Sequence, residues 1–220
     1  MKKLCSVIAL ALLSSSQAYA NLITNGGFES PAVLPYAMTS ATPPTGWSYS
    51  GSTVDYYSFT NMWGIPAQSG NYYIAFGGNS TTGGRLTQDF NATAGDSFHG
   101  EFWLSAQQFL QTGNPLQQLN VQIINLDDDS VAYNNDFSIF DKVWTKEAFD
   151  FVAPSANLRL QLTDVTTSQN SGPVNMGLDT VSIVEGSGQG PANVPEPASL
   201  ALLGAGLVGT RIFGKRRKQP

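Results

Sequence analysis

Short runs of alternating apolar and polar residues recur through the middle of the chain. They fall at residues 72–76, 86–90, 97–106, 119–126, 144–152, 158–163 and 176–184. Because successive side chains of a strand point to opposite faces, this period of two predicts β-strands. Gly, Asn, Asp and Pro lie between the runs, and residues 21–185 hold no helical period over a dozen residues. The pattern predicts an all-β domain, either a β-sandwich or a jelly roll.

The segment 97–105 shows which face each side chain of a strand is expected to occupy. Three apolar side chains share one parity and three amphipathic or polar ones share the other: Phe98, Phe102 and Leu104 against His99, Glu101 and Trp103. We expect the first set to face the core and the second to face solvent or a ligand groove.

The first twenty residues have the three parts of a secretory signal peptide. A lysine pair precedes an apolar run at 4–13, and small residues then lead to Ala18-Tyr19-Ala20. This order predicts cleavage between Ala20 and Asn21, rather than an uncleaved anchor. The only cysteine, Cys5, lies inside this segment, so the mature chain is expected to have no disulfide and no cysteine metal site.

The last part of the chain has the order of a membrane anchor. A Gly, Ser and Pro linker at 186–193 precedes Val194-Pro195-Glu196-Pro197, an apolar stretch at 198–213 and a basic cluster at 215–218. The stretch predicts a transmembrane helix of roughly 24 Å, short for a hydrocarbon core of about 30 Å. The basic residues predict that the preceding domain lies outside the cytoplasm.

The tail at 194–220 resembles the PEP-CTERM sorting signal through Pro195-Glu196-Pro197, the apolar helix and the basic cluster, in that order. The resemblance implies that an exosortase, a membrane protease, recognises the motif and removes the tail. It also implies a Gram-negative bacterium that makes exopolysaccharide, with the domain first held at the inner membrane and then at the cell surface or in the matrix. The alternative is an ordinary single-span anchor.

The remaining residues, 21–185, have the size of one domain and a strongly acidic charge. They contain four of the 11 Lys and Arg residues and 15 of the 16 Asp and Glu residues, a net charge of −11 (4 − 15). Such a domain repels nucleic acid and anionic lipid, and we therefore exclude both as its partners.

Motifs spread over this domain resemble the galactose-binding-like jelly roll of several carbohydrate-binding modules. They are the opening at 21–29 (NLITNGGFE), Gly46-Trp47, 66–74, 86–88, Ala94-Gly95, Trp144 before 151–153, and 177–181. The resemblance implies a jelly-roll β-sandwich. Because this fold carries many functions, it implies sugar binding only by analogy.

The same resemblance implies a structural calcium held by Glu29 and Asp179, with Asn25 of the opening motif beside them. Calcium prefers hard oxygen ligands, which carboxylates supply. Asp179 shares its parity with Val181 and Ile183, so we expect it on their inward face. The alternative is that both carboxylates only accept hydrogen bonds from turn amides.

Flat rings stack on sugars, so aromatic residues are candidates for ligand binding. The candidate rings are those of Trp103, Trp63, Tyr56, Tyr57 and Trp47, and Gln107 shares the outward parity of Trp103. The alternative is that each ring packs in the core. Asp127-Asp128-Asp129 lacks the spacing of an EF-hand and predicts an exposed hairpin turn.

The sequence does not favour an enzyme. His99 is the only histidine, and there is no nucleophile motif, P-loop or dinucleotide fingerprint. Glu101 is the one candidate for the acid of a glycoside hydrolase. We expect a non-catalytic exported module that binds extracellular polysaccharide, with a matrix or adhesion protein as the alternative and a hydrolase third.

Overall fold

The computed structural model describes residues 19–31, 43–51, 54–58, 66–76, 83–108, 116–166 and 174–186. All of them belong to the compact unit formed by residues 19–188. The predicted transmembrane helix at 198–213 lies outside the described residues, as does the signal peptide up to residue 18. Within the described ranges, no helix is long and apolar enough to cross a membrane.

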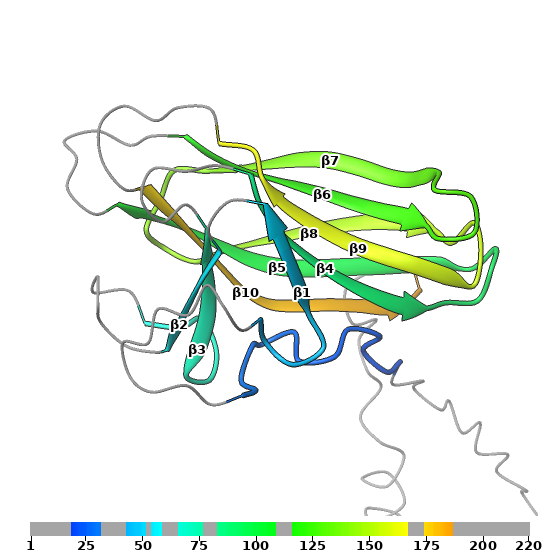
Figure 1. The fold of residues 1–220 in the computed structure, drawn as a ribbon, viewed down its shortest axis with the longest axis horizontal. Helices are drawn as coiled ribbons and strands as arrows, with labels where there is room; N and C mark the ends of the chain where they lie inside the picture. The colour runs from blue at the N-terminus through cyan, green and yellow to red at the C-terminus, as the bar shows by residue number, and fades with distance from the viewer. Residues whose placement is uncertain are drawn as a thin grey trace, which may run out of the picture. The chain divides into compact units, whose positions relative to one another are not determined.

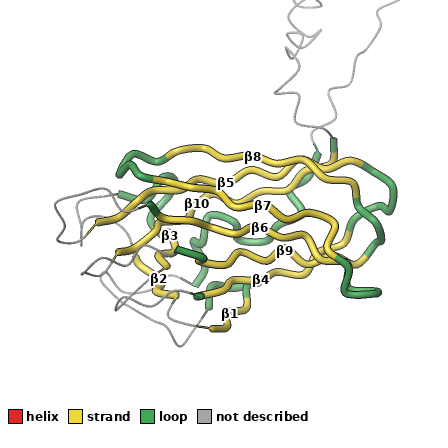
Figure 2. The backbone as a smooth tube through the Cα atoms, turned by 90° about the horizontal axis from the view of Figure 1, so that it is seen from above, coloured by secondary structure: helices red, strands yellow, loops and turns green. Residues whose placement is uncertain are grey.

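The described part of the domain is built from ten strands in two antiparallel layers (Figure 1), without a helix (Figure 2). The first sheet has the order β1-β4-β9-β6-β7 and the second β2-β3-β10-β5-β8. The strands are β1 (Ser48–Gly51), β2 (Val54–Ser58), β3 (Tyr72–Phe76), β4 (Gly84–Asn91), β5 (Ser97–Gln108), β6 (Gln117–Asn125), β7 (Val131–Ile139), β8 (Thr145–Val152), β9 (Asn157–Asp164) and β10 (Val174–Glu185). The prediction of an all-β sandwich is confirmed.

The core lies between the two sheets and follows the alternation that the sequence predicts. Phe98, Phe102 and Leu104 of β5 are buried, whereas the three residues between or beside them are only half-buried. Rings join the layers: Phe102 of the second sheet meets Phe137 of the first edge-on, with centroids 5.0 Å apart. Such pairs stabilise the sandwich beyond the area that they bury.

Sequence patterns locate the buried strands better than the edge strands. All seven predicted segments contain strands, whereas β1, β2 and β7 are additional. In β7 only Phe137 and Ile139 are buried, because this strand ends the first sheet and exposes most of its length. An edge strand that buries so little has no clear period of two. The predicted hairpin turn at Asp127–Asp129 is confirmed, since these residues are exposed between β6 and β7.

A bulge in β10 overturns the expected position of Asp179. The register of β10 against β5 shifts between Asp179 and Ser182, and Thr180 has a positive φ of 49°. Before the bulge, the core residue Leu178 lies opposite Leu104 and Asp179 lies opposite Trp103. Asp179 therefore points away from the core. The bulge reverses the parity of the residues that follow it, so Val181 and Ile183 point inward although the sequence gives them the parity of Asp179.

The segment that follows the predicted cleavage point lies beside the second half of β10. The amide of Leu22 donates to Ile183 O at 2.8 Å, and the amide of Val181 donates to Gly26 O at 2.9 Å. The side chain of Asn21 accepts a further bond from the Ile183 amide at 3.0 Å. The predicted cleavage point therefore lies immediately before a segment that is hydrogen-bonded to β10.

The contact at Gly26 makes a testable prediction, because it leaves no room for a side chain. A Cβ at Gly26 would lie 1.9 Å from Val181 O, whereas one at the neighbouring Gly27 would meet nothing nearer than 4.0 Å. We expect Gly26→Ala to lower the free energy of unfolding by about 1–3 kcal/mol and Gly27→Ala to change it by less. Denaturant unfolding of both variants measures this, and equal effects would contradict the packing.

Candidate functional site

The outward surface of the first sheet is covered by amide, hydroxyl and charged side chains. On β4, β6 and β9, every outward residue is polar except Ile124. We call this surface the amide face, and we define it by Ser48, Ser50, Arg85, Thr87, Asp89, Gln118, Asn120, Gln122, Asn134, Asp136, Ser138, Arg159, Gln161 and Thr163. No aromatic residue is among them.

The strand register aligns these side chains in rows across the sheet. One row contains, in order, Ser48, Thr87, Gln161, Gln122 and Asn134. The next contains Ser50, Arg85, Thr163, Asn120 and Asp136. With neighbouring strands about 4.8 Å apart, a row across five strands is roughly 19 Å long.

Hydrogen bonds within and between the rows fix the orientation of the amides. Gln161 Nε2 donates to Gln122 Oε1 at 2.6 Å. Asn120 Nδ2 donates to Asn134 Oδ1 at 2.8 Å and to Asp136 Oδ1 at 2.6 Å. Because a primary amide has two donor hydrogens and an acceptor oxygen, these bonds use only part of its capacity. The face is therefore both ordered and able to bind a polar ligand.

The charges on the amide face are balanced. Arg159 donates through Nε to Asp89 Oδ1 at 2.6 Å and through Nη2 to Asp89 Oδ2 at 2.9 Å. This bidentate pair raises the pKa of the arginine. Arg85 and Asp136 are the other two charged residues of the face, so its formal charge is zero (2 − 2).

The carboxylates of Glu29 and Asp179 both accept hydrogen bonds from backbone amides of the turn that precedes β3. Glu29 Oε1 accepts hydrogen bonds from the amides of Asn71 and Tyr72 at 2.8 and 2.9 Å. Asp179 Oδ2 accepts from the amides of Gln68 and Ser69 at 2.9 and 3.1 Å. These four bonds join three distant parts of the chain, and they are the turn contacts that the sequence offered as the alternative to calcium.

The environment of Asp179 makes its negative charge unfavourable. Burial raises its pKa to about 7, and the nearby charge of Glu29 adds to this, whereas the amides of Ser69, Thr180 and Gln68 lower it. Both carboxylates are hard oxygen donors, and a divalent cation would offset the burial and the repulsion. Asn25 points elsewhere, because its side-chain nitrogen donates to Ser30 O at 2.7 Å and Thr45 O at 3.0 Å.

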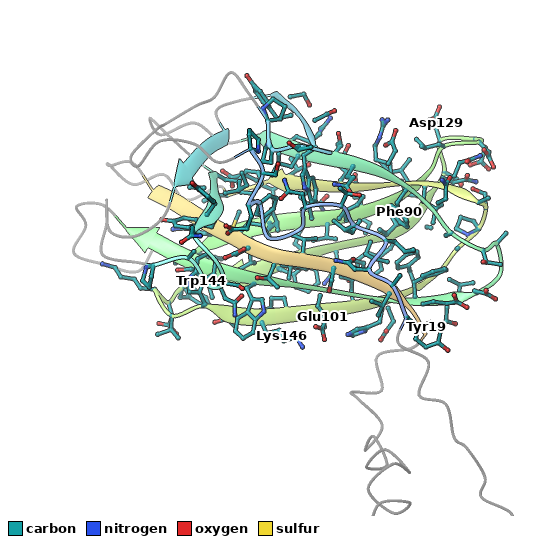
Figure 3. The ribbon with its side chains drawn as sticks, turned by 90° about the horizontal axis from the view of Figure 1, so that it is seen from below. Tyr19, Phe90, Glu101, Asp129, Trp144 and Lys146 are labelled. Carbon is teal, nitrogen blue, oxygen red and sulfur yellow. The ribbon has the colours of Figure 1, made fainter. Side chains whose placement is uncertain are left out.

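Trp103 lies half-buried on the outward face of the second sheet, opposite Lys146 of β8. Next to it, charged side chains connect β5 to β8, and Figure 3 shows Glu101 and Lys146 on the same side of the ribbon. His99 Nδ1 is 2.8 Å from Asp150 Oδ1, and His99 Nε2 is 3.1 Å from Glu101 Oε1. Glu101 Oε1 also pairs with Lys146 Nζ at 2.5 Å.

These contacts shift the pKa of Glu101 downward. Burial alone would raise its pKa, but Lys146 and His99 outweigh burial and lower it. A glycosidase acid needs a raised pKa so that it holds a proton near neutral pH. A lowered pKa therefore does not favour Glu101 as the acid of a hydrolase.

Other predicted site residues lie partly or wholly outside the described structure. Trp63, Pro195, Glu196 and Pro197 are outside the described residues. Tyr56 and Gln107 lie on β2 and β5, with only their backbones described. At the predicted processing site, Ala20 and Asn21 are exposed.

The amide face was not identified from the sequence. The available signal was the alternation of Gln118, Asn120 and Gln122 with buried Leu119, Val121 and Ile123 along β6. The pattern identifies a strand with one polar face. It does not show that β9 and β7 place further amides beside that face, because strand order depends on contacts far apart in the sequence.

Comparisons with known proteins give a sorting motif and a fold. Residues 193–218 match the PEP-CTERM protein-sorting motif, which indicates an exported protein. The structure is similar to TmCBM61, solved in complex with β-1,4-galactotriose, with a TM-score of 0.53 and 13% identity over 76% of this chain and 99% of that chain. This similarity to a carbohydrate-binding module confirms the predicted jelly roll.

A second similar structure is the arabinose-bound MgGH51 α-L-arabinofuranosidase, with a TM-score of 0.52 and 15% identity. The match covers 76% of this chain and 26% of that chain, so the chain spans about a quarter of the enzyme's length. No curated protein matches the sequence. At such low identities the comparison shows the fold alone.

The charged side chains around His99 predict a pH dependence. Burial would lower the pKa of His99, but the bonds to Asp150 and Glu101 outweigh it and raise the pKa. A raised folded-state pKa stabilises the fold fully below the unfolded pKa, and this contribution is lost as pH rises through the folded value. We expect wild type to lose more stability over that window than His99→Gln does, because only the contribution of His99 is removed in the variant.

Proton NMR gives a direct measurement, because His99 is the only histidine of the chain. In a protein without a histidine tag, its imidazole signal should titrate above the pKa of the unfolded protein. A folded pKa equal to or below the unfolded one would contradict the contacts with the two carboxylates.

Proposed function

We propose that the protein is an exported, non-catalytic module that binds extracellular polysaccharide through the amide face. The observation that carries this proposal is the alignment of Gln161, Gln122 and Asn134 across neighbouring strands. Amides and hydroxyls exchange hydrogen bonds with sugar hydroxyls as both donors and acceptors. A glycan can therefore bind along a row without any movement of the backbone.

The sorting motif supports the location that this function needs. A match at 193–218 fits processing by an exosortase at the membrane, after transient anchoring through 198–213. The domain would then remain at the cell surface or in the matrix, next to the polysaccharide. The likeness to TmCBM61, which was solved with a galactotriose, also supports a glycan ligand.

A structural role in the matrix, without a sugar site, is the second candidate function. It is favoured by the bonds within the rows, such as the 2.6 Å bond between Gln161 and Gln122, because amides that pair with each other need no ligand. The third possibility keeps sugar binding but moves it to the outward face of the second sheet, where the ring of Trp103 would stack on the sugar.

Paired substitutions distinguish these three possibilities. We expect Gln122→Ala with Gln161→Ala to weaken glycan binding about tenfold, since two hydrogen-bonding side chains are lost at about 0.5–1.5 kcal/mol each. Trp103→Ala should leave the affinity for the glycan within about twofold of that of wild type. Affinity electrophoresis against a polysaccharide panel measures both variants. Loss of binding only in Trp103→Ala would place the sugar on the second sheet, and no binding by wild type would favour the structural role.

We further propose that Glu29 and Asp179 hold a structural calcium ion. The support is the convergence of two oxygen donors in a place where burial and the charge of Glu29 raise the pKa of Asp179. When bound, the cation would supply positive charge between the carboxylates and the turn at Gln68–Tyr72. Asn25 is not included, because its amide binds Ser30 and Thr45.

The dependence of the melting temperature on calcium tests this second proposal. Without metal, the raised pKa of Asp179 means that stability falls as pH rises toward and through about 7. We expect added calcium to raise the melting temperature of wild type above that pH, but not that of Asp179→Asn. The control is Asp128→Asn on the exposed hairpin, which should respond as wild type does. A melting temperature independent of calcium, in protein verified as metal-free, would exclude the site.

A further inference from the structure

We propose that the ligand of the amide face is an uncharged polysaccharide in an extended conformation, and that the domain excludes polyanionic glycans. This inference rests on the proposed function and names its ligand class. The evidence comes from the distribution of charge over the domain and from the geometry of the rows.

The net charge of the domain lies entirely off the amide face. Residues 21–185 have a net charge of −11, and the amide face contributes zero. The other surfaces must therefore carry all of the excess negative charge. An approaching polyanion meets a repulsive field, whereas an uncharged chain does not.

Arg159 of the face is already paired with a carboxylate, so its guanidinium fork is not available to a second one. Both Nε and Nη2 of Arg159 bond to Asp89, which uses the geometry that would otherwise bind a uronate. The Nε of Arg85 lies 3.4 Å from Thr163 Oγ1. The remaining charged residue, Asp136, accepts from Asn120 and would repel an anion.

Exposed carboxylates at one end of the amide face add to the discrimination against anionic glycans. The exposed hairpin Asp127–Asp129 joins β6 to β7 beside Arg159, and the charge of Asp129 contributes to the raised pKa of that arginine. Asp127 Oδ1 accepts from Asn157 Nδ2 at 2.9 Å, which fixes the hairpin against β9. A chain that extends past the rows at this end would meet carboxylates.

The rows also fit an extended chain better than a compact or terminal sugar. The donors and acceptors of Thr87, Gln161 and Gln122 lie side by side on three neighbouring strands. Such spacing provides repeated hydrogen bonds along roughly 19 Å. A single sugar would use only one or two of them, so affinity should increase with chain length.

The experiment compares uncharged and polyanionic glycans on the full secreted domain. Glucomannan and galactan serve as uncharged probes, and alginate and polygalacturonate as polyanions, at low and high salt. We expect the uncharged chains to bind with little salt dependence and the polyanions not to bind. The double variant Gln122→Ala, Gln161→Ala should bind the uncharged chains about tenfold more weakly than wild type. If the double variant unfolds, the near-isosteric Gln161→Glu takes its place.

Each outcome has a distinct meaning. Salt-sensitive binding of alginate that is lost in the double variant would overturn the inference and keep the proposed function. Binding of neither class at high protein concentration would overturn both. Binding of uncharged chains that the amide variants do not weaken would move the site off the amide face and also overturn the inference.

Discussion

The structure depends on how it accommodates the carboxylate of Asp179. Just before the bulge in β10, this residue points away from the core, yet it is fully buried. A buried charge without partners is costly, so the amides of Gln68 and Ser69 must lie against it. Those bonds position the turn before β3, and the same bulge presents the Val181 amide to Gly26. One irregularity therefore fixes both the N-terminal segment and the turn.

Regular alternation elsewhere gives the sandwich an apolar interior and two outward surfaces with different properties. Inward residues form a continuous apolar core. Outward residues of the first sheet form a neutral hydrogen-bonding face, and those of β5 and β8 form a charged network around His99. The two outward surfaces belong to different sheets. Titration of His99 can therefore change the attachment of β8 without a direct contact with the amide face.

The sequence predicted the buried strands and the core because burial imposes a clear period of two, as in β5. It did not predict β7, whose residues are mostly exposed, and it placed Asp179 on the wrong face because parity cannot reveal a bulge. The amide face depends on the order β4-β9-β6-β7, which places Gln161 beside Gln122 from 39 positions away. Short motifs contain no information about such neighbours, whereas the acidic charge of the domain could be read directly from its composition.

The separation of the turn and the amide face also bears on how the domain can bind a ligand. Glu29 and Asp179 act on the second sheet, whereas the rows are held by backbone ladders and side-chain bonds of the first sheet. A row that is already ordered loses little conformational entropy when a glycan binds, which favours affinity. Strand pairing and side-chain bonds thus order the amide face, and the protonation of Asp179 can change the stability of the turn before β3 without altering that face.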